Sequence, residues 1–152
     1  MDYKITVEAA SPLTLAAVRD TVPISGIARA WKPALDKVWT FLRANQVSNS
    51  GLNVFLYHHP ERRDDPMNID FGVQVLNRFE DAGDVRCVET PSGEVAQTVH
   101  IGSYDRMGEA HAAIHQWCKA NQRQIAGASW EIYGHWNNDP EKLETTIQYL
   151  LL

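Results

Sequence analysis

One acid stands in the middle of the most aromatic segment of the chain. Residues 127–136 read Gly-Ala-Ser-Trp-Glu-Ile-Tyr-Gly-His-Trp, a composition typical of a β-strand. Because side chains alternate along a strand, we expect Glu131 to share one face with Tyr133, and Trp130 and Trp136 to share the other. A carboxylate among large apolar side chains is costly to bury without a partner. Water on an open sheet face, a protein group or a ligand must therefore satisfy Glu131.

The composition of the chain excludes several classes of protein. The 152 residues suffice for one domain with a hydrophobic core, and the net charge of −5 lacks the basic footprint of a nucleic-acid binder. No apolar run approaches the roughly 20 residues of a membrane span, and the N-terminus lacks the pattern of a signal peptide. Cys87 and Cys118 match no metal-site spacing. We therefore expect a single cytoplasmic domain, residues 1–152, without membrane contact, direct nucleic-acid binding, metal or cofactor.

Hydrophobic periodicity predicts eight strands and two helices. Apolar residues recur at helical spacing from Ile27 to Leu42, with Pro33 expected in the first turn, and again after Ser103 up to about Asn121. The strands are expected at residues 3–8, 13–22, 52–58, 67–76, 85–89, 94–100, 128–136 and 143–152.

The same order of elements occurs twice, which indicates an internal repeat. A shift of 78 residues superposes Trp39 on Trp117 and sets Glu131 opposite Asn53 and Tyr133 opposite Phe55. We therefore predict an α+β fold of tandem duplicated β-β-α-β-β modules, residues 1–80 and 81–152. The modules would form a wide antiparallel sheet with two helices on one face and a central cleft between them.

Several motifs of the second half resemble the GyrI-like small-molecule-binding domain, also called the AraC-type effector-binding domain. They are Glu-Thr-Pro-Ser-Gly from Glu89, His-Ile-Gly-Ser-Tyr from His100, the Trp-Glu-Ile-Tyr strand around Glu131, and Asp139-Pro140. The first half matches more weakly, through residues 67–75. The resemblance implies that bulky, often aromatic and cationic small molecules bind in the cleft, with Glu131 low among aromatic rings. The chain looks like the stand-alone type, without a helix-turn-helix.

The resemblance leaves three functions open. The first is a receptor or sequestering protein for a hydrophobic aromatic small molecule, cationic or neutral. The second is a hydrolase that opens strained cyclopropane rings of DNA-alkylating compounds. The resemblance implies this function because some stand-alone members of the family look like such hydrolases. In that case Glu131 would activate water, and Tyr104 or Tyr133 would lend a hydroxyl. The third is a gyrase-inhibitory protein with an unknown protein partner.

Aromatic residues near Glu131 complete the expected site. Tyr133 shares its strand face, and Tyr104 begins the second helix, where a place in the core is the alternative. Trp39 is a further candidate, although most helix tryptophans belong to the core, which is the favoured alternative for it. Weaker candidates of the same kind are Trp31, Tyr57 and Phe71.

Two further expectations concern charge. Glu131 should be buried without a Lys or Arg partner, because residues 125–136 contain neither Lys nor Arg. His111 and His115 are four apart on the second helix, but no third metal ligand is evident, so we expect them to be ordinary core or surface histidines.

Overall fold

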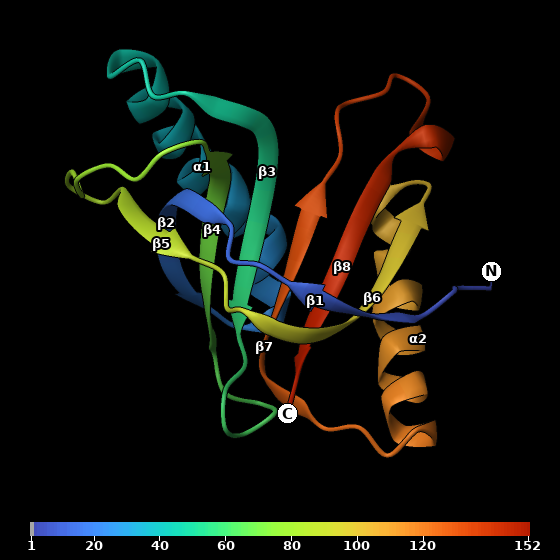
Figure 1. Cartoon of the computed structure of the whole chain (residues 1–152). Helices are drawn as coiled ribbons and strands as arrows, with labels where there is room; N and C mark the ends of the chain where they lie inside the picture. The colour runs from blue at the N-terminus through green and yellow to red at the C-terminus, as the bar shows by residue number, and fades with distance from the viewer. Residues whose placement is uncertain (1) are drawn as a thin grey trace.

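The computed structural model describes residues 2–152, which form a single eight-stranded antiparallel sheet with two α-helices on one face (Figure 1). None of the described helices is long and apolar enough to span a membrane. The elements are β1 (Thr6–Ala10), β2 (Thr14–Val22), η1 (Ile24–Gly26), α1 (Ile27–Ala44), β3 (Asn49–His58), β4 (Met67–Val75), β5 (Arg86–Glu89), β6 (Gly93–Ile101), η2 (Tyr104–Arg106), α2 (Met107–Ala120), β7 (Ile125–Tyr133), η3 (Pro140–Lys142) and β8 (Glu144–Leu151).

The strand order confirms the wide antiparallel sheet and shows that the two modules exchange their first strands. The order is β1-β6-β8-β7-β3-β4-β2-β5, so β1 lies at the edge of the second half and β5 at the edge of the first. The halves meet where β3 pairs with β7. Each half is therefore completed by a strand of the other, which ties the modules into one body.

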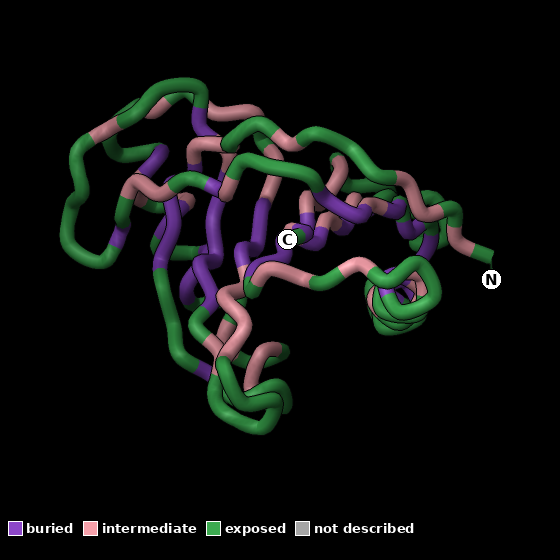
Figure 2. Tube along the Cα trace, turned by 60° about the horizontal axis from the view of Figure 1, so that its bottom comes forward, coloured by how far each residue is buried: buried purple, intermediate pink, exposed green. Residues whose placement is uncertain are grey.

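Each helix presents an apolar stripe to its own half of the sheet. In α1, Leu35, Val38 and Leu42 recur at spacings of three and four and pack on β2 and β4. In α2, Ile114 and Cys118 pack likewise on β6 and β8. Figure 2 shows the buried positions gathered along the strands, with the connecting loops exposed.

The opposite face of the sheet is covered as well. Trp130 is 1% exposed and packs there with Leu15 and Leu56. Leu13, in the connection between β1 and β2, and Val88, in β5, also pack against this cluster. The face that Trp130 shares is therefore internal.

Two predicted details are wrong. Pro33 lies inside α1, because the helix begins six residues earlier, at Ile27. Strand β7 ends at Tyr133, where the backbone N–H of Gly134 donates to the Glu144 carbonyl oxygen at 2.8 Å. Trp136 therefore lies beyond the strand, and the alternation of faces does not apply to it.

The register of the repeat also differs from the predicted shift of 78. Gly51 and Gly127 both have positive φ at a strand irregularity and are 76 residues apart, as are the left-handed Gln46 and Gln122. The pairings of β1 with β6 and of β5 with β2 instead superpose at 80 residues. The difference is one helical turn, because α1 has 18 residues and α2 has 14.

The corrected register changes the counterparts of the central acid. Glu131 corresponds to Phe55, and Tyr133 to Tyr57. Phe55 and Glu131 are also direct partners in the pairing of β3 with β7. The local twofold axis that relates the halves therefore passes between these two residues, in the middle of the sheet.

Candidate functional site

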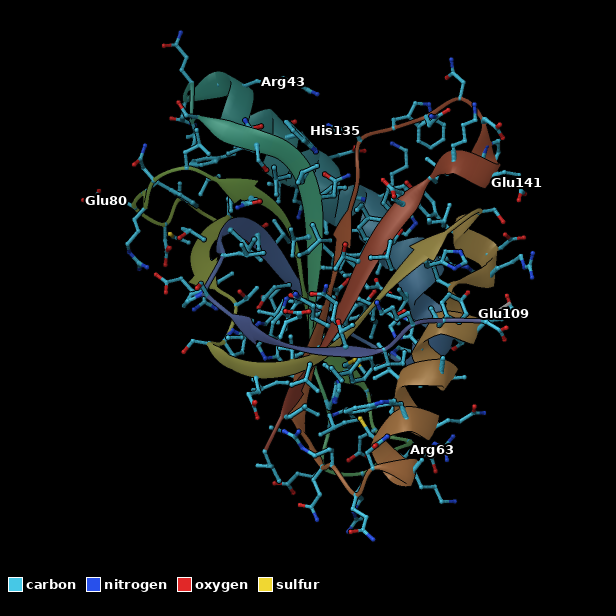
Figure 3. All side chains as sticks on the ribbon, turned by 45° about the vertical axis from the view of Figure 1, so that its right-hand side comes forward. Arg43, Arg63, Glu80, Glu109, His135 and Glu141 are labelled. Carbon is cyan, nitrogen blue, oxygen red and sulfur yellow. The ribbon has the colours of Figure 1, made fainter. Side chains whose placement is uncertain are left out.

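A cavity of about 400 Å³ lies between the two modules, on the helix-bearing side of the sheet. It is the expected central cleft. His135 lies at one end of the sheet and Arg63 at the other (Figure 3), which places the cleft at the His135 end. The lining side chains come from α1, β3, η2, the end of β7 and the segment after it: Ile27, Trp31, Leu35, Asn53, Phe55, Tyr57, Tyr104, Tyr133, His135 and Trp136.

Glu131 lies directly beneath this lining. It is 4% exposed, and its carboxylate Oε1 accepts hydrogen bonds from the hydroxyls of Tyr57 and, at 2.7 Å, Tyr133. Both tyrosines line the cleft. The cleft floor is therefore two phenol rings whose hydroxyls point at a buried carboxylate.

The second oxygen of Glu131 faces helix α2. His111 Nε2 lies 2.6 Å from Glu131 Oε2, and His111 Nδ1 lies 2.7 Å from the Tyr149 hydroxyl. Since a carboxylate only accepts, Nε2–H is the donor in this contact. The tyrosine hydroxyl can then donate to Nδ1 of a neutral imidazole, an assignment that follows from the hydrogen-bond pattern.

The carboxylate of Glu131 has a histidine partner but no Lys or Arg partner in the described part of the chain. Within residues 2–152 no Lys or Arg forms an ion pair with it, and His111 is the partner that sequence reasoning missed. Burial, reinforced by the Glu131 charge, raises the pKa of Tyr57 and of Tyr133 well above the ordinary value. Both hydroxyls therefore stay protonated and remain donors.

The walls of the cleft are aromatic. Trp31 and Phe55 have ring centroids 6.5 Å apart, while Tyr104 meets Tyr133 edge-to-face at 5.4 Å. Phe55 also meets Tyr133 at 4.9 Å. At the mouth, Trp31 is 39% and Trp136 71% exposed, so ring faces are available to a ligand.

The structure brings most of the predicted residues together. Trp31, Tyr57, Tyr104 and Tyr133 line the cleft, with Glu131 behind two of them.

Two predicted residues are placed elsewhere. Trp39 points to the side of the cleft, where its Nε1–H donates to Asn53 Oδ1 at 3.2 Å. Phe71 is fully buried beneath Phe55, with the two rings edge-to-face at 4.9 Å. Neither is among the residues that line the cavity.

Sequence reasoning missed several contributors, including the lining residues Phe55, Asn53 and His135. His111 and Tyr149 complete the polar network, and Trp136 joins the mouth of the cleft. The helical spacing of His111 from Tyr104 and Ile114 marks it as facing inward, and this signal was available in the sequence. Trp136 was missed because its strand was extended past Gly134.

Comparison with known proteins gives one family and several similar folds. The profile of the GyrI-like small molecule binding domain matches residues 3–151. The crystal structure of the EcmrR C-terminal domain has a TM-score of 0.81 at 20% identity, covering 100% of this chain and 99% of that one. No curated protein matches in sequence.

Two further structures are similar over nearly the whole chain. SAV2435 bound to tetraphenylphosphonium has a TM-score of 0.72 at 16% identity, covering 100% of this chain and 94% of that one. A hydrolase encoded by lin2189 from Listeria innocua has a TM-score of 0.62 at 15% identity, covering 98% of this chain and 92% of that one.

Proposed function

The chain belongs to the GyrI-like family of small-molecule-binding domains, and we propose that it is a cytoplasmic receptor or sequestering protein for a bulky aromatic cation. The ligand would lie in the cleft between the modules, against Tyr57 and Tyr133, with Glu131 beneath them. SAV2435 binds a ligand of this chemical class, tetraphenylphosphonium.

One observation carries the proposal: a buried carboxylate, with no Lys or Arg partner in residues 2–152, lies behind an aromatic surface. Removal from water strengthens the attraction between Glu131 and a cation, because the medium around it screens less than water does. The two tyrosines whose hydroxyls bond to Oε1 also line the cleft. Ring faces attract cations that shed water readily, as bulky aromatic cations do.

The dimensions of the cleft agree with a ligand of this size. Cavities that take drug-sized molecules commonly measure roughly 300–1,000 Å³, and this one measures about 400 Å³. Its lining is dominated by aromatic and aliphatic side chains, with Asn53 and His135 as polar exceptions. A ligand with several aromatic rings and little hydrogen-bonding capacity suits such a lining.

Titration with tetraphenylphosphonium tests the proposal. Trp31 and Trp136 lie at the mouth, so binding should quench tryptophan fluorescence and reach an end point at one ligand per chain. Replacing both with Phe should remove most of the quenching while calorimetry still detects binding. Absence of heat and of quenching at millimolar ligand would refute the receptor function.

A hydrolase is the second candidate, favoured by the protonated tyrosine hydroxyls at the cleft floor and by the similar Listeria hydrolase. Water activation would require a water within about 2.6–3.2 Å of a Glu131 oxygen. Both oxygens are already engaged, so Tyr57 or Tyr133 would have to move to admit it.

Turnover separates the two candidates. The protein is mixed with an excess of a cyclopropane-bearing alkylating compound, and ring opening is followed by mass spectrometry. Conversion of the whole excess, lost in Glu131→Gln and kept in Cys118→Ser, would support the hydrolase. If ring opening is no faster than the uncatalysed reaction, the receptor remains as the supported function.

A further inference from the structure

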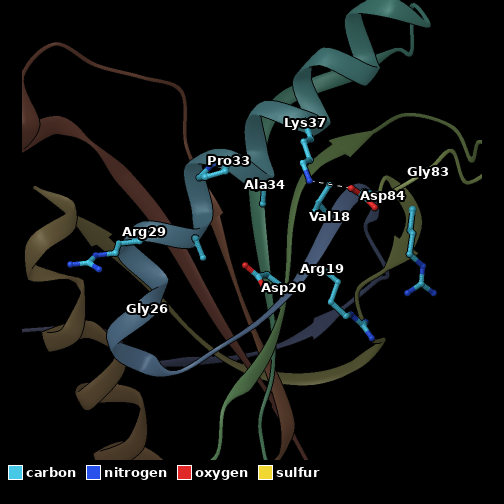
Figure 4. A pocket seen from close by; sticks show the side chains of 12 residues that line it. Val18, Arg19, Asp20, Gly26, Arg29, Pro33, Ala34, Lys37, Gly83 and Asp84 are labelled. Atoms are coloured by element: carbon cyan, nitrogen blue, oxygen red, sulfur yellow. Dashed lines mark hydrogen bonds and ion pairs between the residues drawn. The ribbon is translucent and has the colours of Figure 1, made fainter.

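A second groove lies on the other side of α1, between that helix, β2 and the start of β5 (Figure 4). Its volume is about 630 Å³, and it shares no lining residue with the cleft. Asp20 lies between α1 and the Arg19 side chain in Figure 4. The groove is therefore a separate site, and the receptor function does not use it.

The corresponding place in the second half of the molecule is filled by Tyr3. Its hydroxyl lies 2.8 Å from His100 Nδ1, and the two rings are 5.9 Å apart. Burial and the charge of Glu109 raise the pKa of the Tyr3 hydroxyl, while the charge of Arg106 lowers it, so Tyr3 lies beside the start of α2. Tyr3 also packs against the hydrophobic core of that half.

The repeat relates this occupied place to the open groove. Strand pairing at the two sheet edges superposes Thr6 on Arg86, a shift of 80 residues. The same shift superposes Tyr3 on Gly83 and His100 on Asp20. A side chain at Gly83 would meet nothing within 4 Å, so the first half has open space where the second half has a tyrosine.

A free sheet edge borders the same space. Strand β5 pairs with β2 only from Thr14 to Ala17, so no described strand lies beside the outer edge of β2 from Val18 to Val22. In the second half the segment before β1 follows the equivalent edge of β6, where the Thr98 hydroxyl donates to the Lys4 carbonyl at 3.0 Å. Free backbone groups of this kind accept an extended peptide.

The charged side chains around the groove indicate which residue types should flank the bound part of such a peptide. Arg19 is paired with Asp70, and Lys37 with Asp84. Arg29 and Arg86 line the groove without an ion-pair partner in residues 2–152. Two unpaired guanidinium groups favour acidic neighbours on the ligand.

The hydrogen-bonding position inside the groove is also defined. Asp20 accepts one hydrogen bond, from the backbone N–H of Thr21 at 2.8 Å, and keeps acceptor capacity for a hydroxyl donor. It occupies the position from which His100 bonds the Tyr3 hydroxyl in the second half. We propose that this groove binds an extended segment of a partner protein that inserts a tyrosine flanked by acidic residues.

The probe is the fluorescent peptide Glu-Asp-Tyr-Glu-Asp, acetylated and amidated, titrated with the full chain at low salt. Fluorescence anisotropy should report binding, and NMR should locate the largest amide shifts at Gly26, Gly83 and Asp20. Tyr→Ala in the peptide should weaken binding at least tenfold, since it removes the ring and the hydroxyl donor. Tyr→Phe tests the hydroxyl alone.

Matched variants test whether the groove binds its peptide independently of ligand binding in the cleft. Asp20→Ala should weaken the tyrosine peptide by roughly tenfold, the loss expected for a hydrogen bond to a charged acceptor, and leave tetraphenylphosphonium binding unchanged. Arg29→Glu should weaken the acidic peptide as well. Equal affinity for the tyrosine and alanine peptides, shifts outside the groove, or no binding at millimolar peptide would overturn the proposal. A protein dimer that Asp20→Ala dissociates would assign the groove to a second copy and would also overturn it.

Discussion

The two halves of the sheet differ most where they touch. At the centre of the second half, Glu131 contacts His111, which in turn contacts Tyr149. The positions 76 residues earlier are Leu35, Phe55 and Val73, all in or against the hydrophobic core. The same backbone therefore carries a polar network on one side of the local axis and an apolar cluster on the other.

This difference indicates that the fold itself does not need polar side chains at these positions, so the polar ones are available for another role. The apolar cluster shows that three hydrophobic side chains satisfy the scaffold at these positions. Burying a polar network costs free energy unless every buried group in it is hydrogen-bonded. In return, the network contributes no hydrophobic burial to the core. Its place at the floor of the cleft is consistent with a role in ligand binding.

The largest effect is expected on the apolar side. Phe55→Ala removes a ring that is 6% exposed and packed against Phe71, Tyr133 and Trp31. Loss of such a ring from a core costs about 3–5 kcal/mol of unfolding free energy. Urea denaturation measures the change. A cost below about 1 kcal/mol would mean that neighbouring side chains move to fill the space left by the ring.

A smaller loss of stability is expected on the polar side. His111→Leu leaves Glu131 Oε2 without its donor, which should cost about 1–3 kcal/mol. The double variant His111→Leu, Glu131→Phe copies the Leu35–Phe55 pair of the first half and should recover much of that loss. If the double variant is as unstable as the sum of the two single variants, the halves are not interchangeable at this position.

Trp136, at the mouth of the cleft, should contribute to ligand affinity and not to the stability of the fold. Trp136 is 71% exposed, so Trp136→Ala should leave the unfolding free energy within about 0.5 kcal/mol of the wild type. Loss of ring contact should weaken tetraphenylphosphonium by about 0.5–1.5 kcal/mol, or up to roughly tenfold. Calorimetry and urea denaturation on the same sample distinguish the two effects, and a fall in stability alone would contradict this assignment.

The smallest effect concerns pH. Burial, together with the nearby His115 and His111, lowers the pKa of His59 from its ordinary value of 6.5. The unfolded chain then binds more protons than the folded chain below pH 6.5, so acid reduces stability. The contribution is complete above pH 6.5 and is lost as the pH falls through the folded pKa. His59→Gln should flatten this part of the curve, and an unchanged slope would contradict it.

Much of the fold was predictable because hydrophobic period and turn residues are local signals. The eight strands, both helices and the cleft follow from such patterns. The exchange of β1 and β5 was not predictable, since strand partners depend on the path of the chain in space. The register of the repeat was wrong because a one-turn difference between α1 and α2 hides in an ungapped comparison.

Sequence reasoning found the acid and four of the aromatic side chains at the cleft, namely Trp31, Tyr57, Tyr104 and Tyr133. Glu131 is buried as its apolar strand indicated. The His111 contact depends on how α2 sits on the sheet, and spacing within one helix cannot give that geometry. Trp39 and Trp31 are both tryptophans of the same helix, and only the packed structure distinguishes the one bonded to Asn53 from the one in the cleft.

The central claim is that Glu131 acts through its charge. Calorimetry should compare tetraphenylphosphonium with neutral triphenylphosphine oxide, in the wild type and in Glu131→Gln. At an effective dielectric constant of about 20, a charge roughly 6–10 Å from the cation contributes about 1.5–3 kcal/mol. Cation affinity should therefore fall by roughly ten- to a hundredfold while the affinity for the neutral compound changes by less than about threefold. Equal losses for both compounds would contradict the claim and make Glu131 a determinant of cleft shape.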